Sequence, residues 1–134
     1  MYSSLNSKSL RGFSLLELLV VIAIIGVITV IGVVAYNGYI DSAKAKEAQT
    51  GLQSIYMQQE EYKSIYKQWY TPSGGCGDQT STINTGLFGG QQTLTNSNFR
   101  FCISVSSTSY IAHAYNKTSG GTSFWIRNTN QKSW

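Results

Sequence analysis

The sequence predicts an α+β fold in which a long N-terminal helix packs, through its second half, on a small antiparallel β-sheet. Three patterns support this prediction. An uncharged, mostly apolar run occupies residues 18–40, a helical stripe continues from Asp41 to Trp69 without a proline, and strand-like alternation begins at Phe99. The first pattern is typical of a membrane helix, the second of an amphipathic helix, and the third of strands with one buried face.

The apolar run is long enough to cross a membrane. Residues 18–40 would form about 34 Å of helix, and a hydrocarbon core is roughly 30 Å thick. From Phe13 to Tyr36 the one charged side chain is Glu17. Inserting a carboxylate into such a span costs about 2.5–3.5 kcal/mol, so we expect Glu17 to have a function and a cationic partner.

The residues around Glu17 form a dense motif. Lys8 and Arg11 make a short basic leader, Gly12 precedes Phe13, and Glu17 is the fifth residue counted from that phenylalanine. This pattern resembles the N-terminal signal of type IV pilins and type II secretion pseudopilins. The resemblance implies that a prepilin peptidase cuts between Gly12 and Phe13 and then N-methylates Phe13. It also implies that Glu17 pairs with the N-terminal amine of a neighbouring subunit, which is cationic at neutral pH and offsets the burial of the carboxylate.

The motif divides the chain into three expected segments. Residues 1–12 are a leader that is removed, residues 13–36 are a transmembrane and assembly helix, and residues 37–134 are a globular head. Within the head we expect the amphipathic helix to reach about residue 70, followed by a variable loop over 71–98 and a β-meander over 99–134. A plain signal anchor, which would retain residues 1–12, is the alternative to a cleaved leader.

The resemblance also implies a function. The chain would be a structural subunit of a type IV pilus, serving adhesion, motility or DNA uptake, with no enzymatic activity and no cofactor. It would first span the inner membrane once, with a cytoplasmic N-terminus. An inner-membrane assembly platform would then draw it into a homopolymer or a mixed filament with other pilins, as an extracellular pilus or a periplasmic filament. The alternatives are a type II secretion pseudopilin and a DNA-binding minor pilin of a competence system.

The amphipathic part of the helix follows from residue spacing. Its stripe repeats at intervals of three and four residues, which is the period of a helix face seated on a core. The stripe consists of Ala45, Ala48, Leu52, Ile55, Gln59, Tyr62, Tyr66 and Trp69. Pro72, the single proline, stops the helix.

The apolar half of the helix contains three glycines and one departure from the family pattern. Each of Gly26, Gly32 and Gly38 costs a helix about 1 kcal/mol relative to alanine, which suits close helix packing or local unwinding. Many type IV pilins have a proline at the position held by Val34, and there it marks a segment that unwinds in the filament. Without that proline, unwinding here would depend on Gly32 and Gly38.

The second half of the head has the composition of a loop followed by strands. Residues 71–98 are rich in small polar residues and glycine, which predicts a long connection with one short strand from about Ile83 to Phe88. Three strands are expected at 99–105, 110–115 and 123–127, joined by short turns. They would form an antiparallel meander whose apolar face covers the helical stripe.

The two cysteines predict a structural disulfide. Cys76 and Cys102 belong to a domain expected outside the cytoplasm, where a bridge between them would contribute about 3–4 kcal/mol by the loop-closure model. The chain has no Cys-x-x-Cys pair for redox chemistry, and a metal site would need further ligands. Asp78, beside Gly77, is a single carboxylate and makes a weak calcium site.

The remaining polar residues do not indicate an enzyme. His113 is the only histidine, and it has no serine and aspartate arrangement typical of a catalytic triad. Its place on a predicted strand is typical of a packed or surface histidine. Asn116 opens an Asn-Lys-Thr glycosylation sequon, a motif that is common by chance.

A cluster near the C-terminus predicts either a nucleic-acid contact or ordinary packing. Trp125, Arg127, Lys132 and Trp134 interleave aromatic and basic side chains, as single-strand-binding surfaces do. The other interpretation is that Trp125 packs in or beside the core and Trp134 covers the sheet. The formal charge of +4 falls to 4 − 2 = +2 when Lys8 and Arg11 leave with the leader, so overall charge gives little steering toward DNA.

Overall fold

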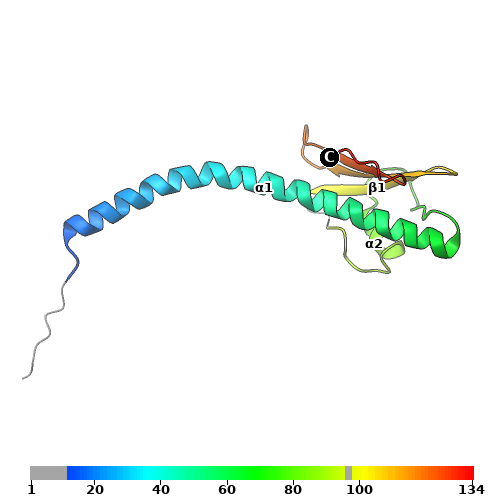
Figure 1. Ribbon diagram of the computed structural model, residues 1–134, viewed down its shortest axis with the longest axis horizontal. Helices are drawn as coiled ribbons and strands as arrows, with labels where there is room; N and C mark the ends of the chain where they lie inside the picture. Colours follow the sequence, from blue (N-terminus) through cyan, green and yellow to red (C-terminus); the bar gives the residue numbers. More distant parts are fainter. Residues whose placement is uncertain (1–11, 96–97) are drawn as a thin grey trace, which may run out of the picture. The chain divides into compact units, whose positions relative to one another are not determined.

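A computed structural model of the chain describes residues 12–95 and 98–134 and confirms the α+β class. Its elements are, in chain order, α1 (Leu15–Tyr66), α2 (Thr80–Gly86), β1 (Phe99–Val105), β2 (Tyr110–Asn116) and β3 (Phe124–Arg127) (Figure 1). The chain separates into two compact units between Ile40 and Asp41. The first unit holds the apolar part of α1, and the second holds the rest of that helix with all the other elements.

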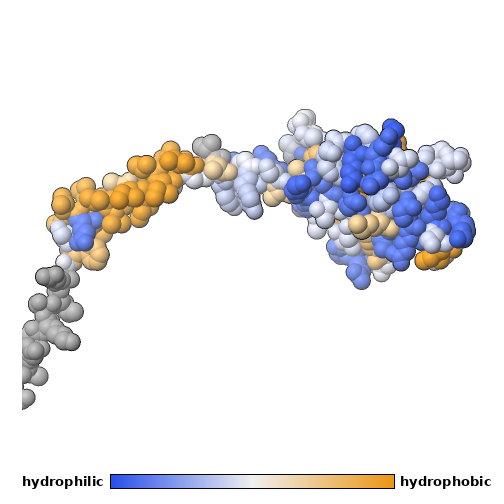
Figure 2. All heavy atoms as spheres, in the orientation of Figure 1, coloured by the Kyte–Doolittle hydropathy of each residue, from blue (hydrophilic) through white to orange (hydrophobic). Residues whose placement is uncertain are grey.

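The apolar unit exposes its side chains on every side. Helical hydrogen bonding starts where the Leu18 N–H donates to the Ser14 carbonyl at 3.2 Å, so α1 begins slightly after the predicted start at Phe13. The large apolar side chains described between Leu15 and Val33 are 42% to 87% exposed. Figure 2 shows them as an almost continuous apolar surface. The helix runs without interruption through the three glycines of this stretch.

Thr29 is the one serine or threonine of residues 18–40, and its hydroxyl is bonded to the backbone. Thr29 donates its hydroxyl hydrogen to the Ile25 carbonyl, one turn earlier, at 2.7 Å. This bond satisfies the polar group without water or a second chain. The most apolar window of α1 has a mean hydropathy of 3.2, and the helix is long and apolar enough to cross a membrane.

In the second unit, α1 buries one face. Ala48, Leu52 and Ile55 are fully buried and form the hydrophobic core together with the facing side of the sheet. Gly51 lies on the same face, where an added methyl group would come within 2.8 Å of the Phe101 ring. The missing side chain therefore allows close approach of helix and sheet.

The helix ends at Tyr66, a few residues before the predicted limit near residue 70. Lys67 takes a left-handed conformation with φ of 60°, and its N–H donates to the Lys63 carbonyl at 2.8 Å. Such a residue terminates a helix and turns the chain. Two stripe assignments were consequently wrong: the Tyr66 side chain is 60% exposed, and Trp69 reaches the core from the following turn instead of from the helix.

A buried glutamine fixes this turn to the helix. The Gln59 side-chain amide donates to the Tyr70 carbonyl, and its oxygen accepts the Tyr70 N–H, both at 2.9 Å. Gln59 is fully buried, and this two-way pairing satisfies both ends of its amide. The polar member of the predicted stripe thus holds the returning chain in place.

The predicted antiparallel meander is confirmed, with the strands in the order β1-β2-β3. Side chains alternate between an inner face, which packs on α1, and an outer face. The buried residues of the inner face are Phe99, Phe101, Ile103, Tyr110, Ala112, Ala114, Phe124 and Ile126. The sheet lies along the head part of α1 in Figure 1.

The strand predicted around Ile83 to Phe88 is wrong, because residues Thr80–Gly86 form the short helix α2. Ile83 and Leu87, one helical turn apart, are both buried. The Asn84 side chain donates to the Leu94 carbonyl and accepts the Leu94 N–H, each at 2.9 Å. This pairing satisfies the backbone of the returning segment without a strand, and a composition-based prediction could not anticipate it.

Polar side chains close the outer edge of β1. The Gln79 N–H donates to the Phe101 carbonyl at 2.9 Å, and the Gln79 side-chain oxygen accepts the Ile103 N–H at 2.9 Å. The Phe101 N–H donates to the Thr80 hydroxyl at 3.1 Å. The segment before α2 thus takes the place of a neighbouring strand.

The C-terminal tail closes the opposite edge of the sheet. The Ser133 N–H donates to the Trp125 carbonyl at 3.1 Å, and the Trp125 N–H donates to the Ser133 hydroxyl at 2.9 Å. The Arg127 N–H donates to the Gln131 carbonyl at 3.0 Å. Both edges of the three-stranded sheet are therefore paired by the chain itself.

Candidate functional site

The predicted cleavage position lies in an exposed stretch just before α1. Gly12, Phe13 and Ser14 are not helical, and the Phe13 side chain is 79% exposed. Lys8 and Arg11, the basic residues of the predicted leader, lie outside the described residues. The described residues on the C-terminal side of the Gly12–Phe13 peptide bond are therefore exposed, as access by a peptidase requires.

Glu17 lies in the first turn of α1 and is exposed. A negative charge is favourable there, because the first N–H groups of a helix have no intrahelical partner and its N-terminus carries partial positive charge. Among residues 12–95 and 98–134, no lysine or arginine forms an ion pair with Glu17.

One comparison decides the nature of this segment. A family model described as the prokaryotic N-terminal methylation motif matches residues 8–33. The chain carries a prepilin signal. This signal is that of type IV pilins and pseudopilins, a structural and non-enzymatic family. The matched residues of the prepilin signal include Gly12, Phe13 and Glu17, and they extend over most of the exposed apolar surface of α1. No curated protein and no solved structure matches the chain.

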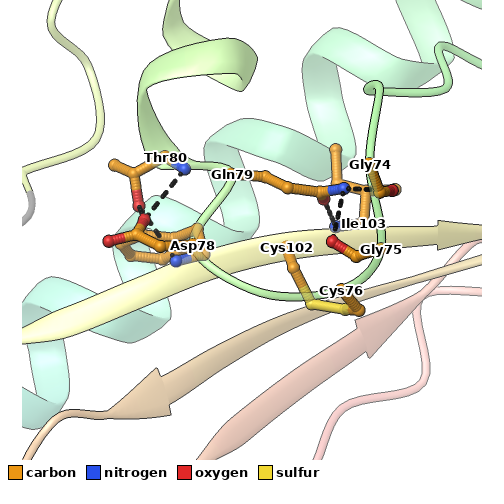
Figure 3. The surroundings of a disulfide bond; sticks show 9 residues. Gly74, Gly75, Cys76, Asp78, Gln79, Thr80, Cys102 and Ile103 are labelled. Carbon is orange, nitrogen blue, oxygen red and sulfur yellow. Dashed lines mark hydrogen bonds between the residues drawn. A yellow bond between two sulfur atoms is a disulfide. The ribbon is translucent and has the colours of Figure 1, made fainter.

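The two cysteines fasten the loop before α2 to β1. Cys76 and Cys102 form a disulfide, with their Cα atoms 5.3 Å apart (Figure 3). The Gln79 side-chain amide, next to this bridge, donates to the carbonyls of Gly74 and Gly75 at 3.2 and 3.3 Å. Gln79 therefore holds the glycine-rich loop on one side and the edge of β1 on the other.

The outer face of the sheet brings together two of the three residues predicted to contact nucleic acid. Trp125 and Arg127 both lie on this face, and the Arg127 guanidinium carbon is 5.0 Å from the Trp125 ring centre. Lys132 instead lies in the tail that pairs with β3, with its amine 5.7 Å from the Trp134 ring centre. The three residues therefore lie close in space but not on a single strand face.

Sequence reasoning assigned three other members of this face no definite place in the cluster. Arg100 and Tyr115 are cross-strand partners, and the Arg100 guanidinium carbon is 5.6 Å from the Tyr115 ring centre. His113 stacks on Tyr115, with ring centres 5.3 Å apart and planes inclined by 9°. The strand register was the missing signal, because it pairs His113 with Trp125 and so joins the two halves of the face.

Burial shifts the pKa values of Tyr70, Tyr110 and His113 in the head, and for the Tyr70 hydroxyl it raises the pKa, with a smaller contribution from Tyr62. His113 is half-buried on the outer face, and this burial lowers the pKa of its imidazole. Tyr110 is buried on the inner face, and burial, followed by the nearby Glu60 carboxylate and the Tyr56 hydroxyl, raises the pKa of its hydroxyl. No described residue forms a hydrogen bond with that hydroxyl.

The described residues offer no arrangement for a metal ion. Within residues 12–95 and 98–134, no three histidine, cysteine, aspartate or glutamate side chains converge. The Asp78 carboxylate accepts the Thr80 N–H at 3.2 Å and the Thr80 hydroxyl at 2.7 Å. These bonds give Asp78 a structural role at the start of α2.

Proposed function

We propose that this protein is a structural subunit of a type IV pilus, cleaved after Gly12 and N-methylated at Phe13. The prepilin signal carries this proposal, because it coincides with the start of an exposed apolar helix that has one acid in its first turn. The proposed segments are a removed leader of residues 1–12, an assembly helix of residues 13–36 and a head of residues 37–134.

The exposed apolar surface of α1 supports the proposal that this helix is covered first by the membrane and later by helices of other subunits. Side chains such as Leu15 and Val30 are 87% and 72% exposed. Exposing so much apolar surface to water is unfavourable, so lipid or another apolar surface is expected to cover them. The inner membrane supplies the first cover, with the chain spanning it once and its N-terminus in the cytoplasm. Helices of neighbouring subunits supply the second, after an assembly platform transfers the chain into a filament.

Glu17 would set the register of the filament. The cleaved chain begins at Phe13, so its terminal amine is a cation at the same end of the helix as the carboxylate. One subunit's amine pairing with the next subunit's Glu17 gives a head-to-tail contact, which generates an open helical assembly. The pair also offsets the cost of placing each charge in an apolar surrounding.

The first experiment tests processing. Intact-mass measurement of protein from the native host should find a chain starting at Phe13 with one added methyl group. Gly12→Leu should block cleavage, so that the leader remains attached. A wild-type protein that retains residues 1–12 would contradict the proposal and support a plain signal anchor.

Glu17→Ala separates assembly from processing. Cleavage and methylation should remain intact, while the unpaired terminal amine would cost the filament about 3–5 kcal/mol per subunit, enough to remove sheared surface filaments. Glu61→Ala is the matched control, since it deletes an exposed acid from the head. Normal piliation of the Glu17 variant would overturn the amine-pairing role. Wild-type filaments retained in the periplasm would indicate a secretion pseudopilin instead.

A further inference from the structure

The outer face of the sheet carries planar and cationic groups in register. Arg100 lies opposite Tyr115, and His113 lies opposite Trp125. Arg127 completes the face beside Trp125 on β3. The opposite face of the sheet is occupied by the core against α1, so these five side chains are directed away from the head part of that helix.

The planar groups make two connected stacks. Arg100, Tyr115 and His113 form the first, with the guanidinium carbon 5.6 Å from the tyrosine ring centre and the two rings nearly parallel at 5.3 Å. Trp125 and Arg127 form the second, at 5.0 Å. Rings and guanidinium planes held in this way are pre-ordered, so a ligand that stacks on them loses little side-chain freedom on binding.

The charge of this part of the chain has one sign. Asp78 is the last acidic side chain in the sequence, so residues 79–134 contain no aspartate or glutamate. The same residues contain four basic side chains, Arg100, Lys117, Arg127 and Lys132. The sheet and its tail therefore attract an anion, although the net charge of the whole chain is small.

A ligand suited to this face is both planar and anionic. Acidic polysaccharides match the charge and stack on aromatic rings through C–H groups, but they have no conjugated π-face, so a flat ligand fits the stacked planes of this face better. An acidic protein surface matches the charge but presents few planar groups at a regular spacing. A single nucleic-acid strand has phosphates for the two exposed guanidinium groups and a base for the partly exposed ring of Trp125, which is how aromatic and basic grooves hold single strands.

We propose that the outer face of the sheet binds single-stranded nucleic acid, with Arg100 and Arg127 contacting phosphates and Trp125 stacking on a base. Tyr115 and His113 lie between these contacts and orient Arg100. This interaction does not depend on filament formation, because all five residues belong to one head.

The test uses the full chain in a non-ionic detergent and a fluorescent thymidine oligonucleotide of about 20 nucleotides, with binding followed by anisotropy across a salt series. Arg100→Gln with Arg127→Gln should weaken binding at least tenfold and reduce the salt slope by about 1.4, the value expected when two phosphate contacts to a single strand are lost. Lys46→Gln with Lys67→Gln is the matched control, because it removes two exposed charges from α1 and the turn after it.

Trp125→Leu separates stacking from charge. It should weaken oligonucleotide binding about fivefold or more, which corresponds to the loss of one stacked base, and weaken binding of dextran sulfate much less. Trp125→Phe should retain part of the affinity, and its thermal unfolding checks that the sheet is intact. Equal losses in both double variants, or dextran sulfate binding as tightly as the oligonucleotide with no effect of Trp125→Leu, would overturn the proposal. Filament assays are not involved, so failure here is distinguishable from failure of the pilus assignment.

Discussion

At the scale of single residues, His113 shows how a half-buried group ties stability to pH. Burial lowers the pKa of its imidazole, so the folded state favours the neutral ring more than the unfolded state does. The unfolded chain therefore binds more protons as the pH drops. The stabilisation from neutral His113 is complete above the unfolded pKa of about 6.5 and is lost as the pH falls through the folded pKa.

His113→Gln should remove this dependence. The free energy of unfolding of the wild-type protein should decrease from about pH 7 to pH 5.5, a window that includes the ordinary histidine pKa and lies above the pKa of most carboxylates. The variant should show a smaller decrease over the same window, measured by urea unfolding followed by circular dichroism. Identical slopes for the two proteins would mean that the imidazole is not buried enough to matter.

At the scale of elements, α1 combines two kinds of helix in one continuous segment. Between Leu18 and Val33 its surface is apolar on nearly all sides, and from Asp41 onward it buries a single stripe. The buried stripe includes Gly51, whose Cα faces the Phe101 ring. The close packing of this helix on the sheet thus requires a glycine at position 51.

Gly51→Ala should destabilise the head despite the better helix propensity of alanine. The propensity gain is about 1 kcal/mol, but the new methyl group would press on a buried aromatic ring, and overpacking of this kind typically costs about 1–3 kcal/mol. Gly75→Ala is the control, because a methyl group there meets nothing within 4 Å. Urea midpoints compare the two, and a Gly51 variant as stable as the wild type would show that Phe101 can move aside.

At the scale of the whole molecule, the head depends on one covalent link. Cys76 and Cys102 are 26 positions apart, and the loop between them contains α2. Replacing both cysteines with serine should lower the free energy of unfolding by about 3–4 kcal/mol by the loop-closure model. The loss should be matched when the wild-type protein is unfolded with a reducing agent present, and a reductant-insensitive unfolding midpoint would contradict it.

Periodicity predicted the apolar span, the buried stripe and the three strands, because each depends on repeated apolar residues at a spacing of 3.6 or 2. The features that it missed depend on single polar contacts or on register. Lys67 ends α1 through its backbone conformation, Asn84 pairs with Leu94 across a loop, and Arg100 meets Tyr115 through strand pairing. The local sequence indicates neither the backbone conformation of Lys67 nor the distant partners of Asn84 and Arg100.

The candidate sites also differ in whether the local sequence or the strand register defines them. The prepilin signal is a contiguous motif, so its residues could be named from the sequence alone and were matched as a unit. The outer face of the sheet is assembled from three strands, so sequence reasoning found Trp125 and Arg127 near each other but did not establish that Arg100, Tyr115 and His113 complete the face.

The paired edges of the sheet limit edge-to-edge association between heads that lie close together. In the filament proposed above, subunits that assemble through their helices would bring many identical sheets to a very high local concentration, the condition under which exposed strand edges fuse into cross-β aggregates. Here Gln79 and Thr80 occupy one edge, and the tail residue Ser133 occupies the other. In the proposed filament each head would therefore remain a closed unit beside its copies, and polymerisation would be confined to the segment that carries the prepilin signal.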